Sequence, residues 1–170
     1  MATSDQRRIY CIKEKWFSLK GDMDINDEQG QKVFTVHGKL FHLGLDMVLK
    51  DDKDSKVCEI RSKISLTPEY DIYDVYDKKI GRLTKQFKLL KEVWHFENLT
   101  NNKKYSILGN FLAYDWKIYN DNVIISEIDR KHSIIKDCYG VSIEPKQDIV
   151  SILCIAICLE KYHHDIHINH

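Results

Sequence analysis

The side chains best suited to chemistry in this sequence are lysines and arginines gathered in one short segment. Between Lys78 and Lys91 the chain carries six basic residues and no acidic one, and another basic pair follows in a later turn. Phosphate groups are bound by converging Lys and Arg side chains with few carboxylates nearby. We therefore predict an anion-binding site formed by Lys78, Lys79, Arg82, Lys85, Lys88, Lys91, Lys103 and Lys104.

The same basic segment also fits a plainer interpretation. Lysines on a solvent-exposed strand discourage pairing with other chains, and runs of charge commonly mark a solvated face. The spacing of three from Lys79 to Lys91 suits a helix face about as well as a strand, and the surrounding pattern favours a strand. The binding and the purely structural interpretations both stay open.

Acidic residues give little support for a calcium site. The loop from Asp51 to Asp54 is interrupted by Lys53, and Asp121 and Asp129 lack the dense acidic spacing of a calcium-binding loop. Surface turns account for both groups, so we predict no bound calcium.

Histidines and cysteines give an equally plain picture. His163 and His167 would share a face if the final helix continued that far, but we interpret residues 163–170 as a polar tail. Cys154 and Cys158 lie among isoleucines, which favours small buried core residues over a metal site. We predict neither a metal nor a cofactor.

Catalytic signatures are missing from the sequence. It contains no nucleophile elbow, no Walker-type phosphate loop, no zinc-protease motif and no dinucleotide-binding glycine pattern. The remaining histidines are scattered and fit ordinary strand or turn positions. We therefore expect a binding domain rather than an enzyme, with an enzyme that uses an unrecognised pocket as an alternative. These scattered histidines are His37, His42, His95 and His132.

Short segments of alternating polarity, separated by polar turns, must position these side chains. Clear examples run from Val33 to Leu40 and from Val57 to Ile64; in the second, Cys58, Ile60 and Ile64 share one face. Counting such segments between residues 9 and 144 gives about twelve strands of ordinary length. The fold class is thus mainly β, built from antiparallel hairpins.

One apolar run near the carboxyl end breaks this pattern. Asp148 is a good N-cap, and the residues from Ile149 to Leu159 are apolar on every side of a helical wheel. A helix of that length rises about 16 Å, roughly half a bilayer core, so we predict no transmembrane span. We predict instead a central helix at about 148–162, enclosed by a closed antiparallel barrel of about twelve strands in one domain spanning residues 1–170.

Composition limits the partners. Lys plus Arg and Asp plus Glu number 26 each among 170 residues, so no net charge draws the protein onto nucleic acid. The odd count of five cysteines at irregular positions is typical of a reducing compartment, and the amino-terminal residues do not read as a signal peptide. We expect a cytoplasmic protein that is peripheral where it meets a membrane.

Several stretches along the chain carry a resemblance to a known family. They are Tyr10 to Ser18, Met23 to Phe34, Ile60 to Tyr73, Gly109 to Asp121, Ile128 to Lys131, Tyr139 to Val141, and the apolar helix closing on Glu160. These stretches resemble the LURP-one-related family, which is related to tubby C-terminal domains and phospholipid scramblases. The likeness covers nearly the whole chain and is most specific near its end, where Gly109-Asn110 leads to Ile118-Tyr119-Asn120-Asp121. Asn122, Cys138 and Glu160 depart from the usual glycine, threonine and aspartate.

This resemblance implies a twelve-stranded barrel around a buried C-terminal helix. For relatives of tubby it also implies binding of phosphoinositide headgroups by basic side chains on the barrel exterior, although none of tubby's binding residues can be carried over one by one. We therefore expect a module that recognises phosphoinositide or another anionic phospholipid. A scaffold domain that binds a protein partner is the alternative.

Overall fold

The computed structural model describes residues 6–15, 22–41, 44–88, 91–110, 113–130 and 138–168. Within these ranges the chain forms twelve strands followed by one helix. The strands are β1 Arg8–Glu14, β2 Met23–Asn26, β3 Lys32–Phe41, β4 Gly44–Asp51, β5 Lys56–Lys63, β6 Glu69–Tyr73, β7 Lys79–Gln86, β8 Glu92–Asn98, β9 Lys104–Asn110, β10 Asp115–Asn120, β11 Val123–Asp129 and β12 Tyr139–Ile143, and the helix is α1 Ile149–Ile168.

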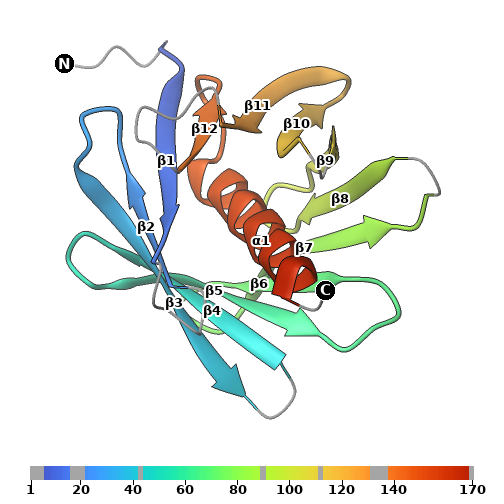
Figure 1. Ribbon diagram of the computed structural model, residues 1–170, viewed down its shortest axis with the longest axis horizontal. Helices are drawn as coiled ribbons and strands as arrows, with labels where there is room; N and C mark the ends of the chain where they lie inside the picture. The colour runs from blue at the N-terminus through green and yellow to red at the C-terminus, as the bar shows by residue number, and fades with distance from the viewer. Residues whose placement is uncertain are drawn as a thin grey trace.

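The strands close into one antiparallel barrel around the helix (Figure 1). Each strand pairs with its neighbours in sequence, and β1 pairs with β12 to complete the ring, with Arg8 opposite Ile143. Closure leaves no long free sheet edge, which removes the template for pairing with other chains. The predicted fold class is confirmed.

Alternation along the strands places the core inside the barrel. Cys58 and Ile60 of β5 are fully buried, as the sequence pattern predicts. Ile64 was expected on the same inward face, but that expectation is wrong, because β5 ends at Lys63 and Ile64 is 77% exposed. The two-residue alternation holds only while the backbone stays pleated.

The helix begins with a set of side-chain hydrogen bonds that join it to the barrel wall. The Ser151 hydroxyl donates to Asp148 Oδ2 at 2.6 Å, and the Asn98 amide at the end of β8 donates to both residues, at 3.1 and 3.2 Å. From Ile152 to Leu159 every residue of α1 is fully buried. No helix among the described residues is long and apolar enough to cross a membrane.

The carboxyl end of the helix differs from the sequence prediction. We expected the helix to end near residue 162 and a polar tail to follow at 163–170, but α1 continues to Ile168. The Tyr162 ring meets Trp94 edge-on at 5.0 Å between centroids, and His163 meets Tyr114 in the same way at 5.0 Å. These contacts with the barrel wall stabilise turns whose polar side chains suggest fraying.

A side chain at position 109, where the protein has glycine, is expected to destabilise the fold. It lies opposite Trp116 across β9 and β10, and a Cβ atom added there would overlap the buried Trp116 ring. We predict that Gly109→Ala lowers the free energy of unfolding by about 1–3 kcal/mol, as overpacked cores do. Urea denaturation measures this, with Ser106→Ala on the outer face of the same strand as control. Equal stability of the two variants would contradict the close packing.

Candidate functional site

The eight basic residues predicted to bind an anion do not form one patch. Strand connections alternate between the two ends of the barrel, so the β6–β7 and β8–β9 turns lie at the end where α1 begins. The β7–β8 connection lies at the end where α1 finishes. Lys78, Lys79, Lys103 and Lys104 therefore lie at the first end, Lys85, Lys88 and Lys91 at the second, and Arg82 on the wall between them.

The segment from Lys78 to Lys91 contains no Asp or Glu, but the neighbouring strand β6 places carboxylates next to it. Asp71 of β6 lies 2.5 Å from the Lys79 ammonium and 3.0 Å from Arg82 Nε. Burial by itself would raise the pKa of Asp71, but the hydrogen bonds from Lys79 and Arg82 outweigh burial and hold that pKa below its usual value. Both cations are thus already paired on the outer wall.

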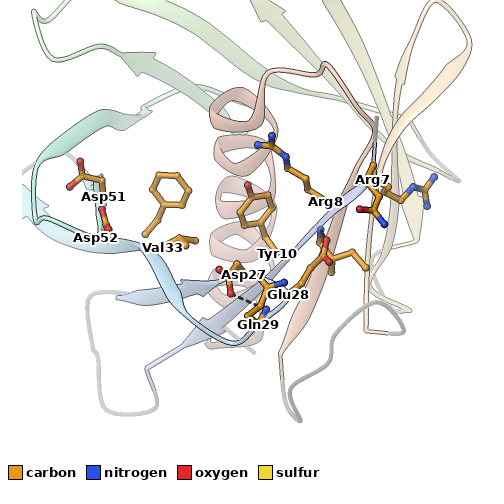
Figure 2. Close-up of a pocket in the computed structure, with 12 residues that line it drawn as sticks. Arg7, Arg8, Tyr10, Asp27, Glu28, Gln29, Val33, Asp51 and Asp52 are labelled. Atoms are coloured by element: carbon orange, nitrogen blue, oxygen red, sulfur yellow. Dashed lines mark hydrogen bonds between the residues drawn. The ribbon is translucent and has the colours of Figure 1, made fainter. Parts of the chain in front are cut away.

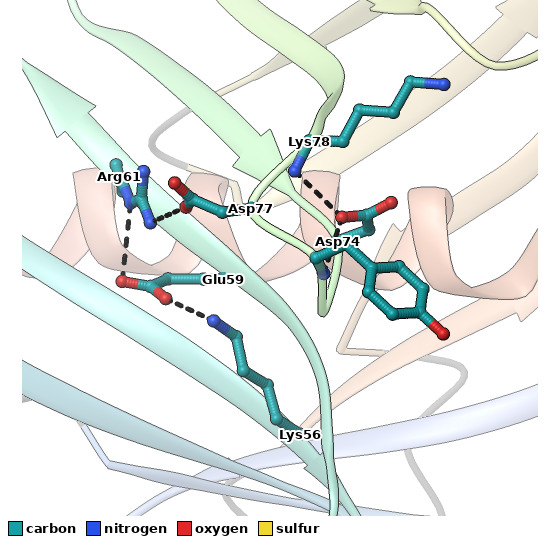
Figure 3. A network of polar contacts seen from close by, with 7 residues as sticks. Lys56, Glu59, Arg61, Asp74, Asp77 and Lys78 are labelled. Carbon is teal, nitrogen blue, oxygen red and sulfur yellow. Dashed lines mark hydrogen bonds and ion pairs between the residues drawn. The ribbon is translucent and has the colours of Figure 1, made fainter.

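A second charged network, centred on Glu59, lies close by (Figure 3). Its carboxylate accepts hydrogen bonds from Lys56 at 2.5 Å and Arg61 at 3.4 Å, and Arg61 also pairs with Asp77. The Lys78 side chain points away from this network and is exposed. Positive charge in this region is therefore largely compensated.

Lys85 turns toward the barrel interior. It is paired in register with the buried Trp94, its ammonium lies 2.9 Å from Glu92 Oε1, and it also hydrogen-bonds the Tyr162 hydroxyl on α1. Burial would lower the pKa of Lys85, but the hydrogen bonds that its ammonium group donates to Tyr162 and Glu92 raise it overall. These contacts occupy the ammonium group and fix the helix to the wall.

Two of the predicted residues, Lys88 and Lys104, line one groove on the outer face of β8, β9 and β10. The cavity volume is about 610 Å³. Across its centre, His95, Ser106 and Tyr119 lie side by side on the three strands. The complete lining is Lys88, Val93, His95, Lys104, Ser106, Leu108, Tyr119, Asp121 and Asn122.

The charge of the groove is concentrated at its Lys88 end. Neither Lys88 nor the nearby Lys91 has an ion-pair partner among the described residues, and both are exposed. Lys104 lies 3.2 Å from Glu97, but the two side chains are 78% and 45% exposed, and such surface pairs contribute little. Asp121 adds one carboxylate at the end where the β10–β11 turn lies.

This groove offers hydrogen-bond donors of several kinds to an anion. Lysine ammonium groups and the Ser106 and Tyr119 hydroxyls suit phosphate oxygens, while Leu108 adds apolar contact. His95 Nε2 already lies 3.2 Å from Gln86 Oε1, which orients the ring. Sequence reasoning missed His95, Ser106 and Tyr119, and only the cross-strand register of these hairpins could have revealed them.

A second cavity of about 550 Å³ lies at the end where α1 begins (Figure 2). Its lining includes Arg8 and Tyr10 of β1, Glu28 in the β2–β3 turn and Asp51 at the end of β4. Glu28 Oε1 accepts a hydrogen bond from the Ile9 amide at 2.9 Å. Acidic residues outnumber basic ones in its lining, so this cavity favours an anion less than the groove does.

Glu160, in the carboxyl half of α1, lies in a largely buried group of titratable side chains with Tyr114 and Tyr139. Glu160 is 4% exposed and hydrogen-bonds the Tyr114 hydroxyl, and burial raises the pKa of Glu160 to about 7. The Tyr114 ring stacks on Tyr139 at 3.6 Å between centroids. Glu160 lines neither cavity described above. Its hydrogen bond with Tyr114 instead joins α1 to the β9–β10 connection. Within the described ranges, no three His, Cys, Asp or Glu residues are grouped to hold a metal ion.

One family model matches most of this chain. The family model described as LURP-one-related matches residues 8–160. An X-ray structure of a protein from Arabidopsis thaliana has a similar fold, with a TM-score of 0.64 and 19% sequence identity. That similarity covers 93% of this chain and 92% of the Arabidopsis chain. No curated protein matches this sequence.

Proposed function

The chain belongs to the LURP-one-related family, and we propose that it is a non-enzymatic binding domain for an anionic phospholipid headgroup such as a phosphoinositide. One observation carries the proposal. Lys88, which follows β7, and Lys104, the first residue of β9, line the same groove together with His95. Cations and neutral hydrogen-bond donors that line one groove can together recognise phosphate.

In this proposal a phosphate group lies near Lys88, the groove lysine that has no ion-pair partner among the described residues. The Ser106 and Tyr119 hydroxyls would donate to oxygens farther along the groove. His95, Ser106 and Tyr119, at the centre of the groove, lie on paired strands. Little conformational entropy is therefore lost when these side chains bind a ligand.

Binding rather than catalysis is supported by the arrangement of His95 and Ser106. The two residues are directly opposite on β8 and β9, but no hydrogen bond joins them in the described structure. The His95 ring is bonded to Gln86 instead. An activated serine nucleophile requires a base within hydrogen-bond reach.

Vesicle flotation tests the groove. We predict that Lys88→Glu with Lys104→Glu weakens binding to phosphoinositide-containing vesicles by at least about tenfold, since each basic residue near such a surface contributes about 1 kcal/mol. The matched control is Lys32→Glu with Lys53→Glu, which changes the net charge equally at exposed positions on β3 and the β4–β5 turn.

Equal loss of binding in both double variants would mean that only net charge matters and would contradict a groove. Failure of the unchanged protein to bind any anionic vesicle would reject the lipid proposal as a whole. The scaffold alternative, in which the loops contact a protein partner, would then be the function to pursue.

A further inference from the structure

Three large apolar side chains project into solvent at the end of the barrel where α1 finishes. Leu66 is fully exposed and Ile64 is 77% exposed, both in the β5–β6 connection. Phe87, after β7, is 83% exposed. Figure 1 shows the β5–β6 connection and the end of β7 on the right-hand side of the barrel. Exposed apolar side chains at one end of the barrel offer a surface for interaction.

The β5–β6 connection that carries two of these side chains is held in place by hydrogen bonds. The Lys85 amide donates to the Pro68 carbonyl at 3.0 Å, which joins the connection to the end of β7. The Ser65 hydroxyl donates to the Thr67 carbonyl within the connection. Leu66 therefore projects from a backbone that the neighbouring strand supports.

The charged residues near these exposed apolar side chains favour binding to an anionic surface. Lys88 directly follows Phe87, and Lys91 lies just before β8; both are exposed and have no ion-pair partner within the described ranges. Tyr76 at the opposite end is also exposed, but the charge next to it is already compensated, because its neighbour Asp77 pairs with Arg61. Apolar side chains next to uncompensated lysines are typical of proteins that lie at an anionic bilayer interface.

We propose that the barrel docks end-on onto an anionic lipid bilayer, inserting Leu66 and Phe87 between headgroups while Lys88 and Lys91 contact lipid phosphates. This inference rests on the proposed lipid-binding function and adds the orientation of the protein. Lys88 also lies at one end of the groove, so a headgroup can enter the groove directly from the bilayer.

A fluorescent label placed on Leu66→Cys tests the orientation. The five native cysteines are all buried, so an environment-sensitive label reacts selectively at the new site. We expect a blue shift and a rise in emission when vesicles of phosphatidylcholine and phosphatidylserine are added. The matched control is Tyr76→Cys, which is 86% exposed in the β6–β7 turn at the other end and should show no shift.

The outcome separates this inference from the proposed function. If the labelled protein floats with the vesicles while emission at position 66 is unchanged, or if position 76 shifts as much, the end-on insertion is wrong and lipid binding stands. If the protein does not float with any anionic vesicle, both proposals fail.

A second variant distinguishes insertion from headgroup recognition. Leu66→Ser with Phe87→Ser should weaken vesicle binding by at least about tenfold, given the transfer free energy of two large apolar side chains. Binding of a soluble inositol phosphate should stay unchanged, since neither residue lines the groove. Unchanged vesicle binding would overturn the inference.

Discussion

Replacing Ile155 with Asp is expected to leave the protein without a cooperatively folded state. Ile155 is fully buried at the centre of α1, with Cys154 and Ala156 on either side also fully buried. A carboxylate there would have to be buried without a partner, which costs several kcal/mol, against a total folding stability of about 5–15 kcal/mol. Circular dichroism during heating would show no cooperative transition.

Ile155→Val is the matched control for this substitution. It removes one methylene from the same site and should lower the free energy of unfolding by only about 0.5–1.5 kcal/mol. The Val variant should elute like the unchanged protein on size exclusion and unfold in one transition. A soluble Asp variant that elutes like the unchanged protein and unfolds cooperatively would mean that the barrel does not enclose the helix as closely as the structure shows.

The barrel and its helix could be predicted because each leaves a simple periodic trace in the sequence. Residues from Ile152 to Leu159 are apolar all round, and only a helix surrounded by other parts of the protein buries such a run. Alternation in β5 predicts that Cys58 and Ile60 share one face, and both are fully buried. These features depend on local periodicity alone.

The candidate site was harder to predict because it depends on strand register. In a strand, residues three apart face opposite sides, so Arg82 and Lys85 could not share one surface. Arg82 lies on the outer wall beside Asp71, whereas Lys85 reaches Tyr162 inside. The basic spacing alone reveals neither the strand nor its acidic neighbour, since the register with β6 is set by long-range pairing.

The extended helix shows a similar limit. His163 reads as part of a polar tail, yet its ring lies against Tyr114, which enters from the β9–β10 connection. A contact between residues so far apart in sequence leaves no periodic signal around either of them. Tertiary packing therefore lengthens the helix beyond the point that local propensity predicts.

Glu160 should make the stability of the protein fall as the pH rises through neutrality. Burial raises the folded-state pKa of Glu160 to about 7, above the ordinary 4.5, so the folded protein binds this proton more tightly than the unfolded chain. The stabilisation is complete below pH 4.5 and is lost as the pH rises through about 7. By linkage its size is roughly 3 kcal/mol at most.

Glu160→Gln is the substitution that isolates this effect. The amide keeps the size of the side chain and an oxygen that can accept the Tyr114 hydrogen bond, but it does not ionise near neutral pH. We expect its urea-unfolding free energy to lose the decline between about pH 5 and pH 8 that the unchanged protein shows. All histidines are present in both proteins, so the difference between the two profiles belongs to Glu160.

The Tyr114 hydroxyl gives this prediction a second, directional test. Its hydrogen bond to the Glu160 carboxylate lowers the pKa of that group and so opposes the larger effect of burial. Tyr114→Phe removes the hydrogen bond and keeps the ring that stacks on Tyr139. The pH at which stability declines should therefore move upward in this variant. A decline at unchanged pH, or one that persists in Glu160→Gln, would show that another group causes it.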